Sequence, residues 1–63
     1  MNPTPEQIKA ARTSAKLTQV QFGALLSAKV RTVEDWESGA RNMPAAKWEL
    51  WTLKAGKLPS LGL

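Results

Sequence analysis

The chain has 63 residues and a formal net charge of +4, from nine lysines and arginines against five acidic residues. It contains neither cysteine nor histidine, which excludes disulfides, Cys/His zinc sites and catalysis that depends on a thiol or an imidazole. We expect one domain, residues 1–63, that buries only about 60% of the surface its unfolded chain exposes. The positive charge suits a polyanionic partner but is also common among small proteins.

The sequence also lacks the features of secreted proteins, membrane proteins and enzymes. The start, MNPTPEQ, has neither the basic residues nor the apolar stretch of a signal peptide. No apolar run approaches the roughly 20 residues of a membrane span. The adjacent acids Glu34 and Asp35 make a poor acid/base pair, and the glycines form no phosphate-binding loop. We therefore expect a cytoplasmic protein without membrane association, enzymatic activity, cofactor or small-molecule ligand.

The first predicted helix covers residues 5–15. Thr4 is a good N-cap, Pro5 suits the first helical position, and Gln7 stands where it completes a capping box. The apolar face of this helix contains residues at helical spacing, namely Ile8, Ala11 and Ala15, with Arg12 beside them.

Two short helices are predicted next, over residues 18–25 and 29–38. Thr18 and Gln21 again form a capping box, and Gly39 can end the second of these helices in a left-handed conformation. The apolar residues recur three and four positions apart, at Phe22, Leu25, Leu26, Val30, Val33 and Trp36. Two helices of about two turns each, separated by about three residues, cross steeply, as in a helix-turn-helix.

This stretch resembles the DNA-binding domain of the lambdoid phage repressor, Cro and XRE family. The resemblance is strongest over residues 17–44 and extends over 8–55. It depends on Leu17-Thr18-Gln19 at the start of the first helix, small Gly23 at the helix crossing, Glu37-Ser38-Gly39 at the end, and apolar Phe22, Leu26, Ala28, Val33 and Trp36. The chain differs from the family at Ser27, where glycine is usual, at Lys29, where Ser or Thr is usual, and in the acids Glu34 and Asp35.

The resemblance implies roles for individual residues. The helix over 29–38 would lie in the major groove of duplex DNA, with base contacts from Val30, Arg31 and Asp35. Phosphate contacts would come from Thr18, Gln19, Lys29, Arg41 and Asn42. A structural ion pair would join Arg12 to Glu37.

Several of these residues also have simpler interpretations. Arg31 could pair with Asp35, four residues later, on an exposed helix face. Asp35 could then orient Arg31, or accept a hydrogen bond from a cytosine amino group. Thr18 and Gln19 could serve only as capping residues, and Arg41 could be a solvated loop charge.

The fourth predicted helix covers residues 44–55, between Pro44 and Gly56, and has two apolar faces. One contains Ala46, Leu50 and Leu53, and the other contains Trp48, Trp51 and Ala55. The irregular tail, 57–63, adds further leucines. We expect a homodimer interface formed by Trp48, Trp51, Ala55 and Leu58, the competing arrangement being a monomer whose tail covers both rings.

The sequence thus predicts an all-α fold, a small bundle of four helices, or of five, with a helix-turn-helix and a λ-repressor-like arrangement. The expected function is that of a homodimeric transcriptional regulator that binds a palindromic operator in double-stranded DNA. The alternative is a protein-interaction module on the same fold, such as an antitoxin-like or phage accessory protein.

Overall fold

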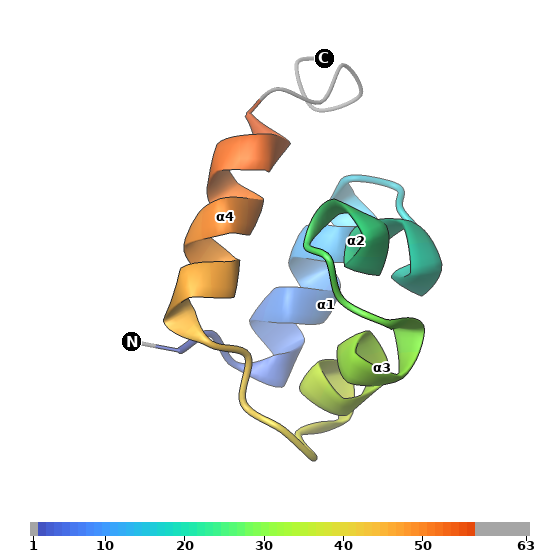
Figure 1. Cartoon of the computed structure of the whole chain (residues 1–63), viewed down its shortest axis with the longest axis vertical. Coiled ribbons are helices and arrows are strands. Elements are labelled where there is room, and N and C mark those ends of the chain that lie inside the picture. Colours follow the sequence, from blue (N-terminus) through green and yellow to red (C-terminus); the bar gives the residue numbers. More distant parts are fainter. Residues whose placement is uncertain (1, 57–63) are drawn as a thin grey trace.

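The computed structural model describes residues 2–56, in which the regular secondary structure is all α-helix, without strands (Figure 1). Its four helices are α1 (Pro5–Ser14), α2 (Gln19–Leu25), α3 (Val30–Ser38) and α4 (Ala45–Ala55). Each boundary lies within one residue of the sequence prediction, which had counted some capping residues as helical. The tail at 57–63 lies outside the described residues, and its predicted irregular structure therefore stays a prediction.

The capping boxes predicted for the first two helices are confirmed. The Thr4 hydroxyl accepts the N–H of Gln7, while the Gln7 side chain accepts the N–H of Thr4. Thr18 and Gln21 repeat this exchange at the start of α2. Each box therefore satisfies two backbone donors that a helix start leaves unpaired.

The connection between α2 and α3 is a four-residue turn, residues 26–29. Ser27 adopts a φ of 55°, the left-handed conformation that glycine accepts most readily. The N–H of Ala28 donates to the carbonyl of Gly23 at 2.8 Å, which folds the turn back onto α2. A Cβ atom at Gly23 would lie 2.5 Å from the Ala28 carbonyl oxygen, so this close approach requires glycine.

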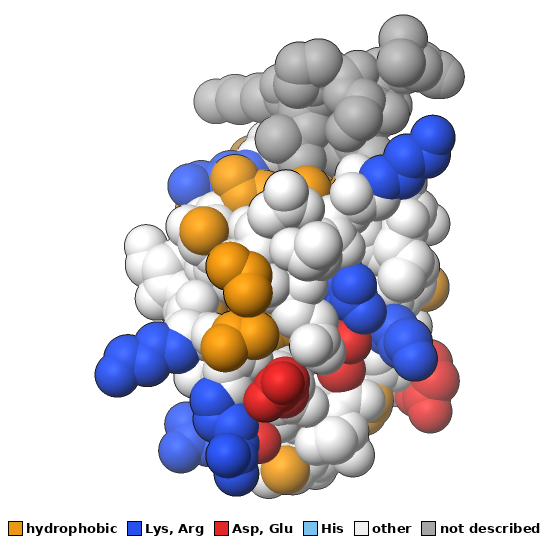
Figure 2. All heavy atoms as spheres, turned by 90° about the vertical axis from the view of Figure 1, so that its right-hand side faces the viewer, with side chains coloured by type: hydrophobic (Ala, Val, Ile, Leu, Met, Phe, Trp, Pro, Cys, Tyr) orange, Lys and Arg blue, Asp and Glu red, His pale blue; other side chains and the backbone are white. Residues whose placement is uncertain are grey.

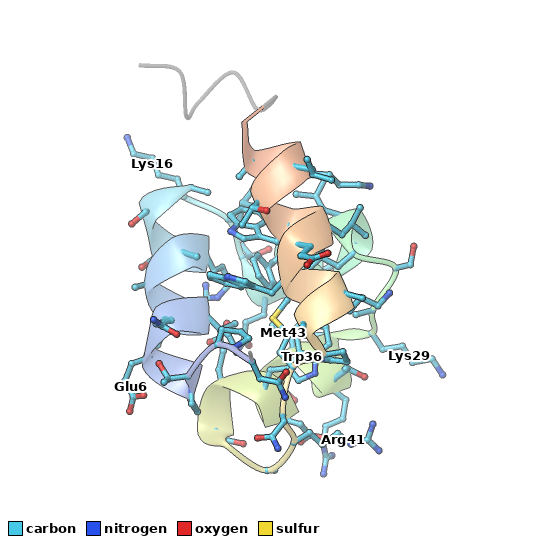
Figure 3. All side chains as sticks on the ribbon, turned by 90° about the vertical axis from the view of Figure 1, so that its left-hand side faces the viewer. Glu6, Lys16, Lys29, Trp36, Arg41 and Met43 are labelled. Atoms are coloured by element: carbon cyan, nitrogen blue, oxygen red, sulfur yellow. The ribbon has the colours of Figure 1, made fainter. Side chains whose placement is uncertain are left out.

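The core lies between α4 and the group formed by α1, α2 and α3 (Figure 1). Its buried residues come from all four helices and from the segments that precede and follow α3, and they are Ile8, Ala15, Phe22, Leu26, Val33, Trp36, Met43 and Trp51. Trp36 is 3% exposed, which confirms its predicted place in the core. In Figure 3, Trp36 and Met43 lie close together near the lower end of α4.

The orientation of α4 differs from the prediction. Trp51 was expected to pack against a second copy of the chain or under the tail, but it is buried in the core and its ring lies 4.8 Å from that of Phe22. Trp48 and Ala55 are half-buried against the same core, whereas Leu53 is 67% exposed. The predicted dimer interface is therefore wrong at Trp51, because burying this large ring in the core removes more apolar surface from water than burying Leu53 would. Leu58 lies outside the described residues.

One polar contact fixes α4 against the end of α2. The Lys47 ammonium donates a 2.6 Å hydrogen bond to the carbonyl of Leu26, the C-cap residue of α2. A cation at this position complements the partial negative charge of a helix C-terminus.

Within residues 2–56, no helix is long and apolar enough to cross a membrane.

Candidate nucleic-acid interface

The outer side of α3 is exposed to solvent and carries a cationic side chain. Val33 and Trp36 bury the inner side of the helix. On the outer side Val30 is 40% exposed, the Arg31 side chain is 82% exposed, and Glu34 is also exposed. The spacing of Val33 and Trp36 thus directs the first turn of α3 outward, with an arginine in it.

The start of α3 has no side-chain cap. Lys29 occupies the N-cap position with extended backbone and makes no capping hydrogen bond through its side chain. The N–H groups of the first turn of a helix have no acceptor within the helix, and they favour an anion. Both the backbone and the lysine at this end of α3 therefore suit a negatively charged partner.

Asp35 lies between two arginines. Its Oδ1 atom is 3.3 Å from Nε of Arg31, and its Oδ2 atom is 3.6 Å from Nε of Arg41. The Asp35 carbonyl also accepts the backbone N–H of Arg41 at 3.2 Å. The pairing of Arg31 with Asp35, considered from the sequence as an alternative, is thus present, and it includes an arginine of the following loop that the sequence had not connected with it.

The cationic side chains of this region point outward together. In Figure 3 the side chains of Lys29 and Arg41 both extend to the lower right, away from α1, while Lys16 extends at the opposite corner. Figure 2 shows lysine and arginine side chains gathered around acidic ones at the lower end of the molecule, the end that α3 occupies in Figure 1. Asn42 is exposed in the same loop as Arg41.

A second polar cluster lies at the other end of α3. Arg12 donates from Nε to Glu37 Oε2 at 2.6 Å and from Nη2 to Oε1 at 3.1 Å, so the two residues expected to pair do so. The Gln19 amide donates to the same Oε1 atom at 3.2 Å. Gln19 had been expected to reach a DNA phosphate, and in the structure its side chain is instead half-buried on Glu37.

Thr18 makes the capping contact that the sequence predicts for it. Its hydroxyl is engaged in the capping box of α2, although the residue itself is exposed. Two further contacts were missed from the sequence, the Gln19 bond to Glu37 and the Lys47 bond to Leu26. No local signal identifies either, because each joins residues 18 or more positions apart.

Neither a protein-family model nor a curated protein sequence matches this chain. Within residues 2–56 no three His, Cys, Asp or Glu side chains gather in a way that could hold a metal ion. The exposed face of α3 and the loop that follows it are therefore the features that indicate a function.

Proposed function

We propose that this chain is a sequence-specific, duplex DNA-binding transcriptional regulator of the Cro or XRE type. The α2–turn–α3 unit would act as its helix-turn-helix, in a λ-repressor-like arrangement, with α3 in the major groove. The observation that carries the proposal is the position of Arg31 in the exposed first turn of a helix whose other side is buried in the core. A recognition helix needs this combination, since it must be rigid on one side and open to base edges on the other.

The chemistry of this helix suits base readout. An arginine can offer two parallel N–H groups to O6 and N7 of guanine, which is the commonest specific contact in the major groove. Val30, 40% exposed one position earlier, could meet the methyl group of thymine. Asp35 could also accept from a cytosine amino group, because a carboxylate has more acceptor sites than its contacts with the two arginines use.

Contacts with the DNA backbone would surround this helix. Lys29 at its N-terminus and Arg41 and Asn42 in the loop after it are all exposed, and the first two are cationic. Such contacts supply affinity and orientation without sequence information, and they make binding depend strongly on salt. Thr18 would place the start of α2 against the same DNA backbone.

We further propose that the regulator binds as a homodimer to a palindromic operator. One α3 helix reaches only a few base pairs, and two-fold related helices about 34 Å apart read two half-sites. Because Trp51 belongs to the core, the contact between copies would not include it, and Trp48, Ala55 and Leu58 remain the proposed interface residues.

A protein-interaction module is the second candidate, and the acidic residues of α3 favour it. Glu34 is exposed on the helix that would face the DNA phosphates, where a carboxylate is repelled. A basic partner protein would instead be attracted by this residue.

Selection of bound duplexes from a random pool tests the proposal. We expect enrichment of a palindromic motif, and we expect Arg31→Ala to relax the preference at one position in each half-site by about 1–3 kcal/mol. A wild-type protein that enriches no motif would exclude sequence-specific DNA binding and leave the protein-interaction module.

A further inference from the structure

Asp35 occupies a position that the proposed DNA contacts do not by themselves explain. An acid on the DNA-facing side of a recognition helix weakens binding to phosphates, yet this one is 21% exposed and lies between two arginines that are 82% and 68% exposed. The two arginines come from different elements, Arg31 from α3 and Arg41 from the loop after it. The acid therefore links a helix to a loop through side chains that otherwise reach into solvent.

The atoms involved show what this link leaves available. Asp35 contacts both arginines at Nε, the atom nearest the backbone in each guanidinium. Among residues 2–56, no hydrogen bond engages the terminal Nη1 and Nη2 atoms of either side chain. Those terminal atoms are the ones that form two parallel bonds with a guanine or a phosphate.

We propose that Asp35 is a positioning residue that holds Arg31 and Arg41 together as one DNA-binding unit, with Arg31 directed at a guanine and Arg41 at a neighbouring phosphate. This inference rests on the proposed function and adds to it a coupling between the base contact and the backbone contact. Holding both Nε atoms restricts two long, flexible side chains before DNA arrives, which lowers the entropy lost on binding. The phosphate bound by Arg41 then fixes where Arg31 reaches the base.

The alternative explanation of Asp35 is a purely structural surface ion pair. Exposed ion pairs contribute little to the stability of a fold, so removing Asp35 should leave the domain folded. The loop also keeps its backbone bond, because the Asp35 carbonyl and the Arg41 N–H are unaffected by a change of side chain. Effects on recognition can therefore be separated from effects on folding.

Glu34 provides a matched control for charge. It is the neighbouring acid on the same helix, it is exposed, and no ion pair engages it in the described part of the chain. Glu34→Ala and Asp35→Ala each remove one negative charge, and both should therefore raise the affinity for unrelated duplexes by a similar factor. Only Asp35→Ala should change the choice of sequence.

The first test needs no DNA. Nitrogen-15 relaxation of the arginine side-chain Nε–Hε groups measures their order in the free wild type, Glu34→Ala and Asp35→Ala, with circular dichroism showing that each is folded. We expect Arg31 and Arg41 to be ordered in the first two proteins and mobile in Asp35→Ala. Equal mobility in all three would overturn the positioning role, whatever the protein binds.

The second test compares the same three proteins in selection from a random duplex pool. We expect Glu34→Ala to retain the wild-type motif, and Asp35→Ala to lose about tenfold in preference at the base read by Arg31. Identical motifs and preferences for both variants would show that Asp35 acts only as a charge. If the wild type enriches no motif while its arginines are ordered, the DNA-binding proposal fails and the direction of Arg31 at a guanine fails with it, whereas the ordering of both arginines by Asp35 stands.

Discussion

Arg12 and Glu37, 25 positions apart, form a two-point ion pair that joins α1 to the last turn of α3. Their side chains are only 14% and 7% exposed. The third donor of the arginine, Nη1, reaches the carbonyl of Leu17 at 3.0 Å, and the Gln19 amide adds a further bond to Glu37. One cluster therefore connects α1, the turn before α2, the start of α2 and the end of α3.

Replacing Arg12 by Met should destabilise the domain strongly. The substitution leaves the Glu37 carboxylate largely buried without its cation, and breaking such a pair costs about 3 kcal/mol or more. A domain of this size has roughly 3–9 kcal/mol of total stability, so urea unfolding should show a large loss.

The double variant Arg12→Met with Glu37→Met is the control for this prediction. Replacing both partners by apolar groups removes the uncompensated charge, and stability should largely return. A single variant as stable as wild type would show that water already solvates the pair.

The ion pair illustrates what the sequence could and could not predict. The helices and their starts follow from local patterns, because caps such as Thr4 with Gln7 involve residues three positions apart. Arg12 and Glu37 were paired only through the resemblance to a family, since nothing in their own neighbourhoods identifies a partner. The Gln19 bond to Glu37 was missed because it depends on how α2 and α3 cross.

The helix crossing makes a prediction for Gly23. A Cβ atom there would lie 2.5 Å from the Ala28 carbonyl oxygen and 3.1 Å from a Val33 methyl group. The backbone of the turn would have to move, so Gly23→Ala should cost about 1–3 kcal/mol in denaturant unfolding.

Gly56→Ala is the matched control, because within residues 2–56 the nearest neighbours of an added Cβ atom are 3.8 Å or more away and the φ of Gly56 is −65°. This change should be neutral or stabilise by up to about 1 kcal/mol, since alanine restricts the unfolded chain more than glycine does. Equal effects of the two substitutions would mean that α2 and α3 cross elsewhere.

The turn itself contains a strained residue. Ser27 has a φ of 55°, where a side chain costs about 1–2 kcal/mol and glycine is tolerated. Ser27→Gly should therefore raise stability by about 0.5–1 kcal/mol, after allowance for the entropy of glycine in the unfolded chain. In Ser14→Gly, at the exposed end of α1, the same change should lower stability by about 0.5–1 kcal/mol in thermal unfolding. A loss at both sites would argue against the left-handed turn.

Trp51 and Leu53 test which side of α4 faces the core. Trp51 is 4% exposed and Leu53 is 67% exposed, although both were candidates for burial. Trp51→Ala should cost about 3–5 kcal/mol and nearly unfold the domain, whereas Leu53→Ala should change stability by less than about 0.5 kcal/mol. Thermal melts by circular dichroism measure both, and a severe effect of Leu53→Ala with a mild effect of Trp51→Ala would reverse the orientation of α4.

The orientation of α4 could not be derived from its own residues. Both faces are apolar at helical spacing, so periodicity alone does not choose between them. The choice depends on the shape of the surface that Phe22 presents, against which the Trp51 ring packs at 4.8 Å. The exposed position of Arg31 follows from helical periodicity and was predicted correctly. The contact of Asp35 with Arg41 depends on the path of the next loop, and the sequence did not predict it.

The salt dependence of DNA binding tests the proposed phosphate contacts at Lys29. Lys29→Gln should weaken binding to the selected duplex and to unrelated duplexes by similar factors, because a phosphate contact carries no sequence information. The slope of log Kobs against log salt concentration should become shallower by about 0.9 for one lost contact. Lys16→Gln removes the same charge at the opposite corner of the molecule in Figure 3 and should leave the slope unchanged. If the two variants change the slope equally, the effect reflects the net charge of the chain, and the surface at the start of α3 does not face the DNA.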